Sequence, residues 1–180
     1  MSDAELLALY REDGNAHRAF DLIVRTYGER LYWHIRKMVI SHDDANDVLQ
    51  NCLVKAWNGL SSFREESKLY TWLYRIATNE VITFLKKHRT RQFQPLCQVS
   101  RKLSDTLHAD PLFDGDALQL KLQKAILTLP NRQRQVFNMR YFDELKYDEI
   151  SEILGTSVGS LKASYHHASE KIEDYMKQHD

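Results

Sequence analysis

Residues 147–169 read YDEISEILGTSVGSLKASYHHAS. The first eight positions carry apolar residues at helical spacing, and Gly155 with the two residues after it predicts a tight turn. A second amphipathic helix follows the turn, and its inward positions are Val158, Leu161, Tyr165 and Ala168. A short helix, a turn and a second helix are the pattern of a helix-turn-helix, although an ordinary helical hairpin would give a similar pattern.

The outer face of the second helix carries small and polar side chains, which are Ser160, Lys162, Ala163, His166 and His167. A helix fits the major groove of DNA, and small or polar residues near its N-terminus let the backbone approach the base edges. The segment therefore predicts contact with duplex DNA through this face.

Helical spacing extends over most of the chain. Apolar residues recur at steps of three and four over 20–38, 45–57, 69–84 and 118–141. Ser41 is expected to cap one of these helices, and Gly59 to end it. Six Gly and three Pro in 180 residues disfavour a many-turn all-β fold. The predicted fold class is all-α.

The helical pattern fails over residues 92–117, where Pro95, Pro111, Gly115 and four Asp occur. A loop of that length is uncommon inside one compact domain. We therefore predict two small helical domains, 1–91 and 118–180, joined by a flexible linker.

The positions of the charges matter more than their sum. Lys plus Arg and Asp plus Glu both number 25, so the formal net charge is zero. Six basic residues and one acidic residue nevertheless lie between Lys68 and Arg91. Aromatic side chains alternate with cations from Lys68 to Arg75, a pattern by which proteins bind single-stranded nucleic acid. A solvated helix face with an aromatic core stripe is the alternative.

A third polar surface is predicted on the helix around residues 44–50, which read DANDVLQ. Its polar face holds Asp43, Asp47, Gln50 and Asn51, opposite an apolar face that includes Cys52. This face suits a basic protein partner, or is simply solvated.

Catalytic chemistry finds little support in the sequence. The glycines are scattered, no Ser lies in a nucleophile-elbow pattern, and adjacent His166 and His167 point about 100° apart on a helix. Cys52 and Cys97 form neither a disulfide framework nor a zinc ribbon. We expect no enzyme activity, no cofactor and no metal. With no apolar run of membrane-spanning length and no signal peptide, a cytoplasmic location is expected.

Together these segments resemble the extracytoplasmic-function (group IV) sigma factors of bacterial RNA polymerase, over about residues 4–92 and 118–176. The resemblance rests on FDLI at 20–23, DANDVLQ at 44–50, TWLYRIATN at 71–79, LPNRQRQVF at 129–137 and YDEISEILG at 147–155. It implies a transcription initiation factor that binds core RNA polymerase, directs it to promoters and assists melting, with an anti-sigma factor as a further partner.

The resemblance also assigns roles to residues. The contacts it implies with the clamp helices of the polymerase β′ subunit are Asp44, Asp47, Gln50 and Asn51. Those with the melted promoter element are Lys68, Tyr70, Trp72, Arg75, Asn79, Lys86, Lys87 and Arg89. Those with the duplex upstream element are Ser157, Ser160, Lys162, Ala163, His166 and His167.

One departure from the family pattern concerns the second helix of the helix-turn-helix. Ser164 and His167 stand where Arg is common, so fewer phosphate contacts and weaker salt dependence are expected. Two alternatives remain at this point. One is a conventional helix-turn-helix regulator that acts without polymerase, and the other is an interaction module that no longer reads DNA.

The length of the linker is compatible with the implied role. Roughly 25 extended residues reach at most about 80–90 Å, and two turns of duplex are about 70 Å. The two domains can therefore reach promoter elements two turns apart.

Overall fold

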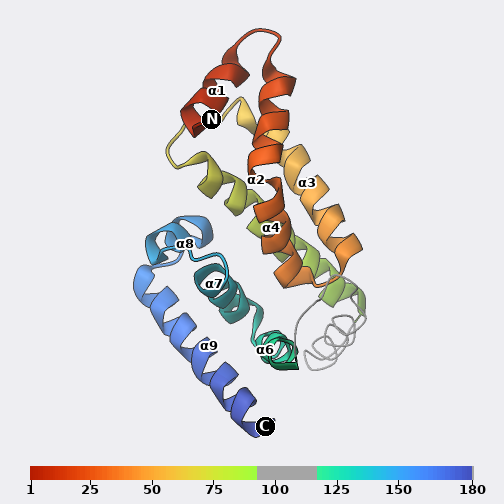
Figure 1. The fold of residues 1–180 in the computed structure, drawn as a ribbon, viewed down its shortest axis with the longest axis vertical. Helices are drawn as coiled ribbons and strands as arrows, with labels where there is room; N and C mark the ends of the chain where they lie inside the picture. The colour runs from red at the N-terminus through yellow and green to blue at the C-terminus, as the bar shows by residue number, and fades with distance from the viewer. Residues whose placement is uncertain (93–116, 180) are drawn as a thin grey trace.

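The computed structural model describes residues 1–92 and 117–179, and within these ranges the regular structure is entirely α-helical (Figure 1). The helices are α1 (Asp3–Arg11), α2 (Ala16–Val39), α3 (His42–Leu60), α4 (Leu69–Gln92), α6 (Ala117–Leu127), α7 (Asn131–Tyr141), α8 (Tyr147–Leu154) and α9 (Val158–Gln178). The predicted all-α class is confirmed. All but the two end residues of the predicted linker lie outside the described residues.

The first domain is a bundle of α2, α3 and α4, with α1 packed against α2. Its core is built from the apolar stripes of the three long helices and includes Ile35, Val48 and Leu73. The expected cap at Ser41 is confirmed, because its hydroxyl accepts a hydrogen bond from the Asp44 N–H at 3.3 Å. Cys52 fills core space as predicted, and burial raises the pKa of its thiol to about 12.

The sequence suggested that a helix ends at Gly59, and α3 does end one residue later, although Gly59 itself is helical. α3 continues to Leu60, and Gly59 lies where the helix meets α4. A Cβ atom at this position would come within 3.1 Å of the Trp72 ring. The small residue therefore serves close helix packing rather than termination.

The second domain contains the predicted helix-turn-helix, with α8 and α9 beginning and ending close to the expected residues. Gly155 adopts a left-handed conformation at φ 62°, and its N–H donates to Ser151 O at 2.8 Å. This is the glycine C-cap that turns the chain out of α8. A small core formed by α6, α7 and α9 supports the motif, and its buried members are Ala125, Ile126, Leu129, Phe137, Ala168 and Ile172. Leu118 is 63% exposed and lies outside the core stripe expected of it.

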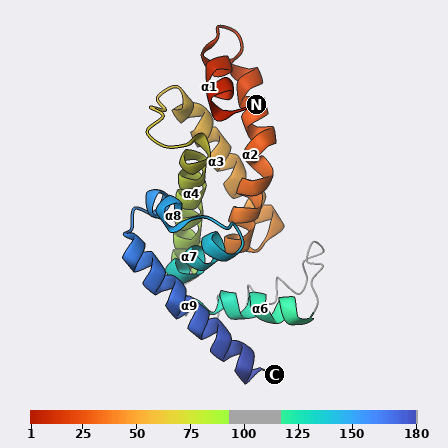
Figure 2. The same ribbon diagram turned by 60° about the vertical axis from the view of Figure 1, so that its left-hand side comes forward.

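The two domains pack directly against each other. α8 contacts α4, and α7 contacts α2, as both ribbon views show (Figures 1 and 2). Val136, Met139 and Leu145 of the second domain belong to the same buried cluster as the core of the first. At the C-terminal end of α2, Ile40 is buried against Leu127 of α6. The sequence did not predict this arrangement.

Candidate polymerase and nucleic-acid interfaces

The polar face of α3 is open to solvent. Asp47, Gln50 and Asn51 are all exposed, as the helical spacing predicted. Asp44 is partly buried in the first turn, where its carboxylate lies near the positive end of the helix dipole. Val54 continues the same face and is 59% exposed. The face therefore combines acidic and amide groups with one apolar side chain.

α4 divides its predicted DNA contacts between two faces. Trp72, Arg75 and Asn79 follow one another at helical spacing, and the last two are exposed. Trp72 is partly buried against Phe63, with ring centroids 5.0 Å apart. Lys86 and Lys87 are exposed further along the helix. Arg89 lies in the same helix, but its side chain is outside what the structure describes.

Tyr70 lies on the other face of α4. Its ring packs 4.5 Å from that of Tyr74, and the Arg30 guanidinium lies 4.2 Å above it. Burial raises the pKa of Tyr70. Lys68 lies near this face too, because its Nζ is 4.0 Å from a carboxylate oxygen of Glu149 in α8. The structure therefore does not join Tyr70 and Trp72 into one aromatic surface.

The outer face of α9 is exposed at every predicted position: Ser157, Ser160, Lys162, Ala163, His166 and His167. The Ser157 hydroxyl accepts from the Ser160 N–H at 3.3 Å and so caps the helix. His166 and His167 both lie near Glu170, at 3.3 and 3.4 Å. One acidic side chain therefore neighbours both histidines of this face.

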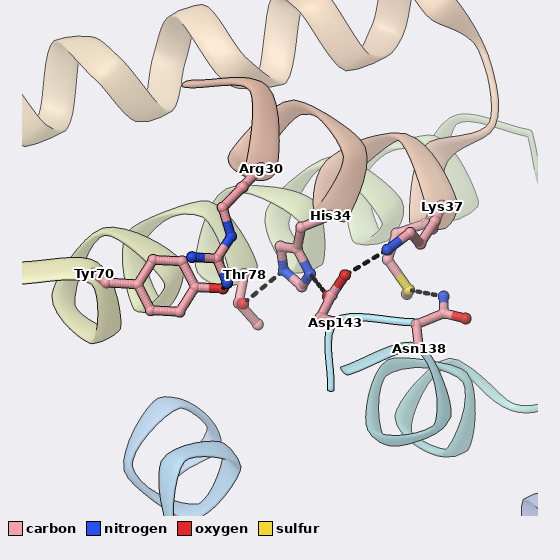
Figure 3. Close-up of polar contacts among 8 residues, drawn as sticks. Arg30, His34, Lys37, Tyr70, Thr78, Asn138 and Asp143 are labelled. Carbon is pink, nitrogen blue, oxygen red and sulfur yellow. Dashed lines mark hydrogen bonds and ion pairs between the residues drawn. The ribbon is translucent and has the colours of Figure 1, made fainter. Parts of the chain in front are cut away.

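A polar cluster that the sequence did not predict lies between the domains (Figure 3). We define the interdomain polar cluster as His34 and Lys37 of α2, Thr78 of α4, and Asp143 from the loop between α7 and α8. His34 Nδ1 lies 3.3 Å from Asp143 Oδ2, and its Nε2 lies 3.0 Å from Thr78 Oγ1. Lys37 Nζ pairs with the other oxygen of Asp143. The side chains of His34 and Asp143 are 2% and 7% exposed.

The charge balance of this cluster favours an ionised carboxylate. Burial raises the pKa of Asp143, but the hydrogen bond and charge of His34 and the charge of Lys37 outweigh it and hold that pKa below its ordinary value. Beside the cluster, the Asn138 amide donates to Met38 Sδ at 3.5 Å, whereas Asn138 Oδ1 is buried with no hydrogen-bond partner. The only sequence signal for the cluster was the position of His34 within an apolar helix stripe.

A second buried charge lies inside the second domain. Arg134 is 3% exposed, and burial lowers the pKa of its guanidinium to about 10. One of its terminal nitrogens donates to Asn131 Oδ1 at 3.0 Å, and its Nε has no partner.

The part of the chain that the structure describes holds neither a metal site nor a membrane-spanning helix. No group of three or more His, Cys, Asp or Glu side chains there is arranged to hold a metal ion. No helix within residues 1–92 and 117–179 is long and apolar enough to cross a membrane.

Comparison with known families settles the class of protein. Residues 23–91 match Sigma-70 region 2, and residues 119–172 match Sigma-70, region 4. The ECF RNA polymerase sigma factor SigW of Bacillus subtilis (strain 168) is 32% identical over 168 residues, covering 88% of this chain and 89% of that protein. The chain belongs to the ECF family of RNA polymerase sigma factors. The ECF RNA polymerase sigma-E factor of Escherichia coli (strain K12) is 30% identical over 170 residues, covering 89% and 87%.

Family membership excludes one of the two alternatives that the sequence left open. An ECF sigma factor is a transcription initiation factor that works with RNA polymerase, and it is not an enzyme. An independent helix-turn-helix regulator is therefore excluded.

Solved structures give the same fold. CnrH in complex with the cytosolic domain of CnrY has a TM-score of 0.70 at 21% identity, covering 99% of this chain and 96% of that one. The sigma factor RpoE in complex with the anti-sigma factor NepR from Bartonella quintana has a TM-score of 0.69 at 21% identity, covering 88% and 96%.

Proposed function

We propose that three exposed faces of this ECF sigma factor divide the work of initiation. The polar face of α3 docks on the clamp helices of the polymerase β′ subunit through Asp44, Asp47, Gln50 and Asn51. The outer face of α4 holds the melted promoter element, and the outer face of α9 reads the duplex element. The observation that carries the proposal is that all three faces are open to solvent on separate helices.

The melting step depends on the face of α4 that holds Trp72, Arg75 and Asn79. An unstacked base is bound by an aromatic ring and a hydrogen-bonding group; Asn79 is exposed on this face, and Trp72 lies on it partly buried against Phe63. Lys86, Lys87 and Arg89 meet phosphates further along the strand. Lys68 is exposed before this helix, 4.0 Å from Glu149 of α8, whereas Tyr70 is packed within the first domain against Tyr74 and Arg30 and contacts the strand only when its ring turns outward.

Reading of the duplex falls to α9. Lys162 and the two histidines lie on its exposed face, and Ser157, Ser160 and Ala163 are small enough to let the helix enter the major groove. Since Ser164 and His167 replace common arginines, this contact has few fixed positive charges.

The organisation and the cellular setting are also part of the proposal. Residues 1–91 form the polymerase-binding and melting domain, 92–117 the linker, and 118–180 the duplex-reading domain. The protein works in the cytoplasm, where polymerase and promoters are. The sigma factor RpoE, which has the same fold, was solved with the anti-sigma factor NepR, and CnrH was solved with the cytosolic domain of CnrY. An anti-sigma protein that covers the exposed faces is therefore the expected regulator.

The test is run-off transcription with purified core RNA polymerase and a library of genomic promoters. We expect discrete start sites that require the full chain and are lost with Asn79→Ala. The control is Glu29→Gln, a change of an exposed side chain on α2. If the chain binds polymerase but gives no start site on any promoter, it does not direct initiation. If it binds neither polymerase nor DNA, it is an interaction module.

A further inference from the structure

The contact between the domains is built from both apolar and charged groups. Met139 and Leu145 join the core cluster of the first domain, and Asp143 between them in the chain pairs with His34 and Lys37. A buried carboxylate is tolerated only where partners replace its water. Because Asp143 comes from one domain and its partners from the other, its pairing exists only while the domains are closed.

The closed arrangement conflicts with promoter binding. Elements read by α4 and α9 must lie apart along the DNA, and the family-implied separation is about two turns, or about 70 Å. In this structure α8, which adjoins α9, contacts α4. Glu149 of α8 also lies 4.0 Å from Lys68, a proposed contact of the single strand. The domains therefore have to separate before both elements are bound.

We propose that this packing is an autoinhibitory contact, and that Asp143, held by His34 and Lys37, sets how often the free chain opens. Thr78 extends the contact to α4, because His34 bridges Thr78 and Asp143. Thr78 is buried on the side of α4 that faces His34, whereas Asn79, the proposed base contact, is exposed on the outer face. The inference rests on the proposed function, because closure matters only if α4 and α9 have to reach separate promoter elements. Apolar packing closes the domains, and the polar cluster fixes their register.

A change at Asp143 therefore has a different effect from a change at its exposed neighbour. Asp143→Asn removes the charge that faces His34 and Lys37 while keeping the side-chain shape. Glu144→Gln makes the same chemical change one residue later, on an exposed side chain. Lys37→Met removes one partner from the other side of the contact.

The experiment measures energy transfer between dyes on the full-length chain. One dye is attached at Glu66, before α4, and the other at Glu152 on α8; both positions are exposed and lie on elements joined by the Lys68–Glu149 pair. The dyes react with cysteines introduced at these two positions. Cys97 is therefore replaced by Ser, while Cys52 is buried and inaccessible to the dyes. We expect one high-transfer population in the parent chain and in Glu144→Gln. In Asp143→Asn the low-transfer fraction should rise about tenfold, with a smaller rise in Lys37→Met.

The second readout is binding to core polymerase. If only the open chain binds productively, a tenfold larger open fraction lowers the apparent Kd about tenfold. Circular dichroism checks that each variant keeps its helices. If Asp143→Asn unfolds, the energy transfer and polymerase affinity of Lys37→Met test the proposal instead. The proposal is overturned if the parent chain already shows low energy transfer between the dyes. It is also overturned if the variants have the same open fraction as the parent chain. Run-off transcription by the parent chain separates this failure from a failure of the proposed function.

Discussion

α4 and α9 both carry predicted DNA contacts, but other helices cover one side of α4 and leave the predicted face of α9 exposed. α4 is covered along one side, where Tyr70 is packed and Lys68 lies near α8. α9 leaves its whole predicted face exposed. Closure of the domains therefore engages the helix proposed to hold single-stranded DNA and leaves the duplex-reading helix open. Which faces of α4 are exposed therefore depends on α2 and on α8 of the other domain as well as on the helix itself.

The largest expected effect comes from removing the Asp143 charge that pairs with α2 across the domain contact. Asp143→Asn should lower the free energy of unfolding by about 1.4 kcal/mol, which corresponds to the tenfold rise in the open fraction, because it removes the counter-charge of Lys37. Glu144→Gln should change it by less than about 0.5 kcal/mol. Urea unfolding of both variants, followed by circular dichroism, measures the difference. Equal stability of the two variants would show that the buried pair contributes nothing.

Acidification should remove the contribution of the Asp143 carboxylate to stability. The pKa of Asp143 is held below its ordinary value in the folded protein, so its contribution is fully present above the unfolded-state value of about 3.9. The contribution is lost as the pH falls through the lowered folded-state pKa. The difference in unfolding free energy between the parent chain and Asp143→Asn should therefore shrink below about pH 4. A difference that stays constant from pH 6 to pH 3 contradicts this account.

Salt dependence distinguishes the exposed faces of the two helices. In the polymerase complex, Lys86→Ala with Lys87→Ala should reduce the slope of log K against log salt by about 1.4 for single-stranded promoter DNA. Lys162→Ala should reduce the duplex slope by about 0.9. Each change should leave the other slope unaltered, since the side chains lie on different domains. Fluorescence titrations at several salt concentrations provide the slopes, and a change in both slopes from one variant would refute the division.

The smallest expected effect concerns the turn at Gly155, which sets the orientation of α9 relative to α8. Gly155→Ala should destabilise the chain by about 1 kcal/mol, because φ at this position is positive. Gly159→Ala, in the first turn of α9, meets open space and should be neutral or stabilising by up to about 1 kcal/mol. Thermal unfolding of the two variants gives the comparison. If both alanines have the same effect, the left-handed cap does not hold the turn.

Local features of the fold were predictable because they depend on neighbouring residues. The stretch 147–169 gave the boundaries of α8 and the glycine turn, and Ser41 gave the start of α3. α1 was missed although Ser2 and Glu5 form a capping box, because the short helix lacks a long apolar stripe. The packing role of Gly59 was missed, since it depends on Trp72 of another helix.

The candidate site divides in the same way. Helical spacing placed the exposed faces of α3 and α9 correctly. It also separates Tyr70 from Trp72, because residues two apart on a helix face different ways, but it could not show that Arg30 of α2 packs on Tyr70. His34 and Asp143 are 109 positions apart, and no local pattern connects residues at that distance. The covered face of α4 is therefore a property of tertiary packing alone.

The most direct test of the account is the affinity of the full chain for core RNA polymerase. Asp47→Ala with Gln50→Ala removes two exposed polar groups from α3, whereas Glu173→Ala with Gln178→Ala removes an acid and an amide from the end of α9. We predict that the α3 pair weakens binding at least about tenfold, as expected for the centre of an interface, while the α9 pair binds like the parent chain. Equal binding by both pairs, or no binding by the parent chain, would contradict the account.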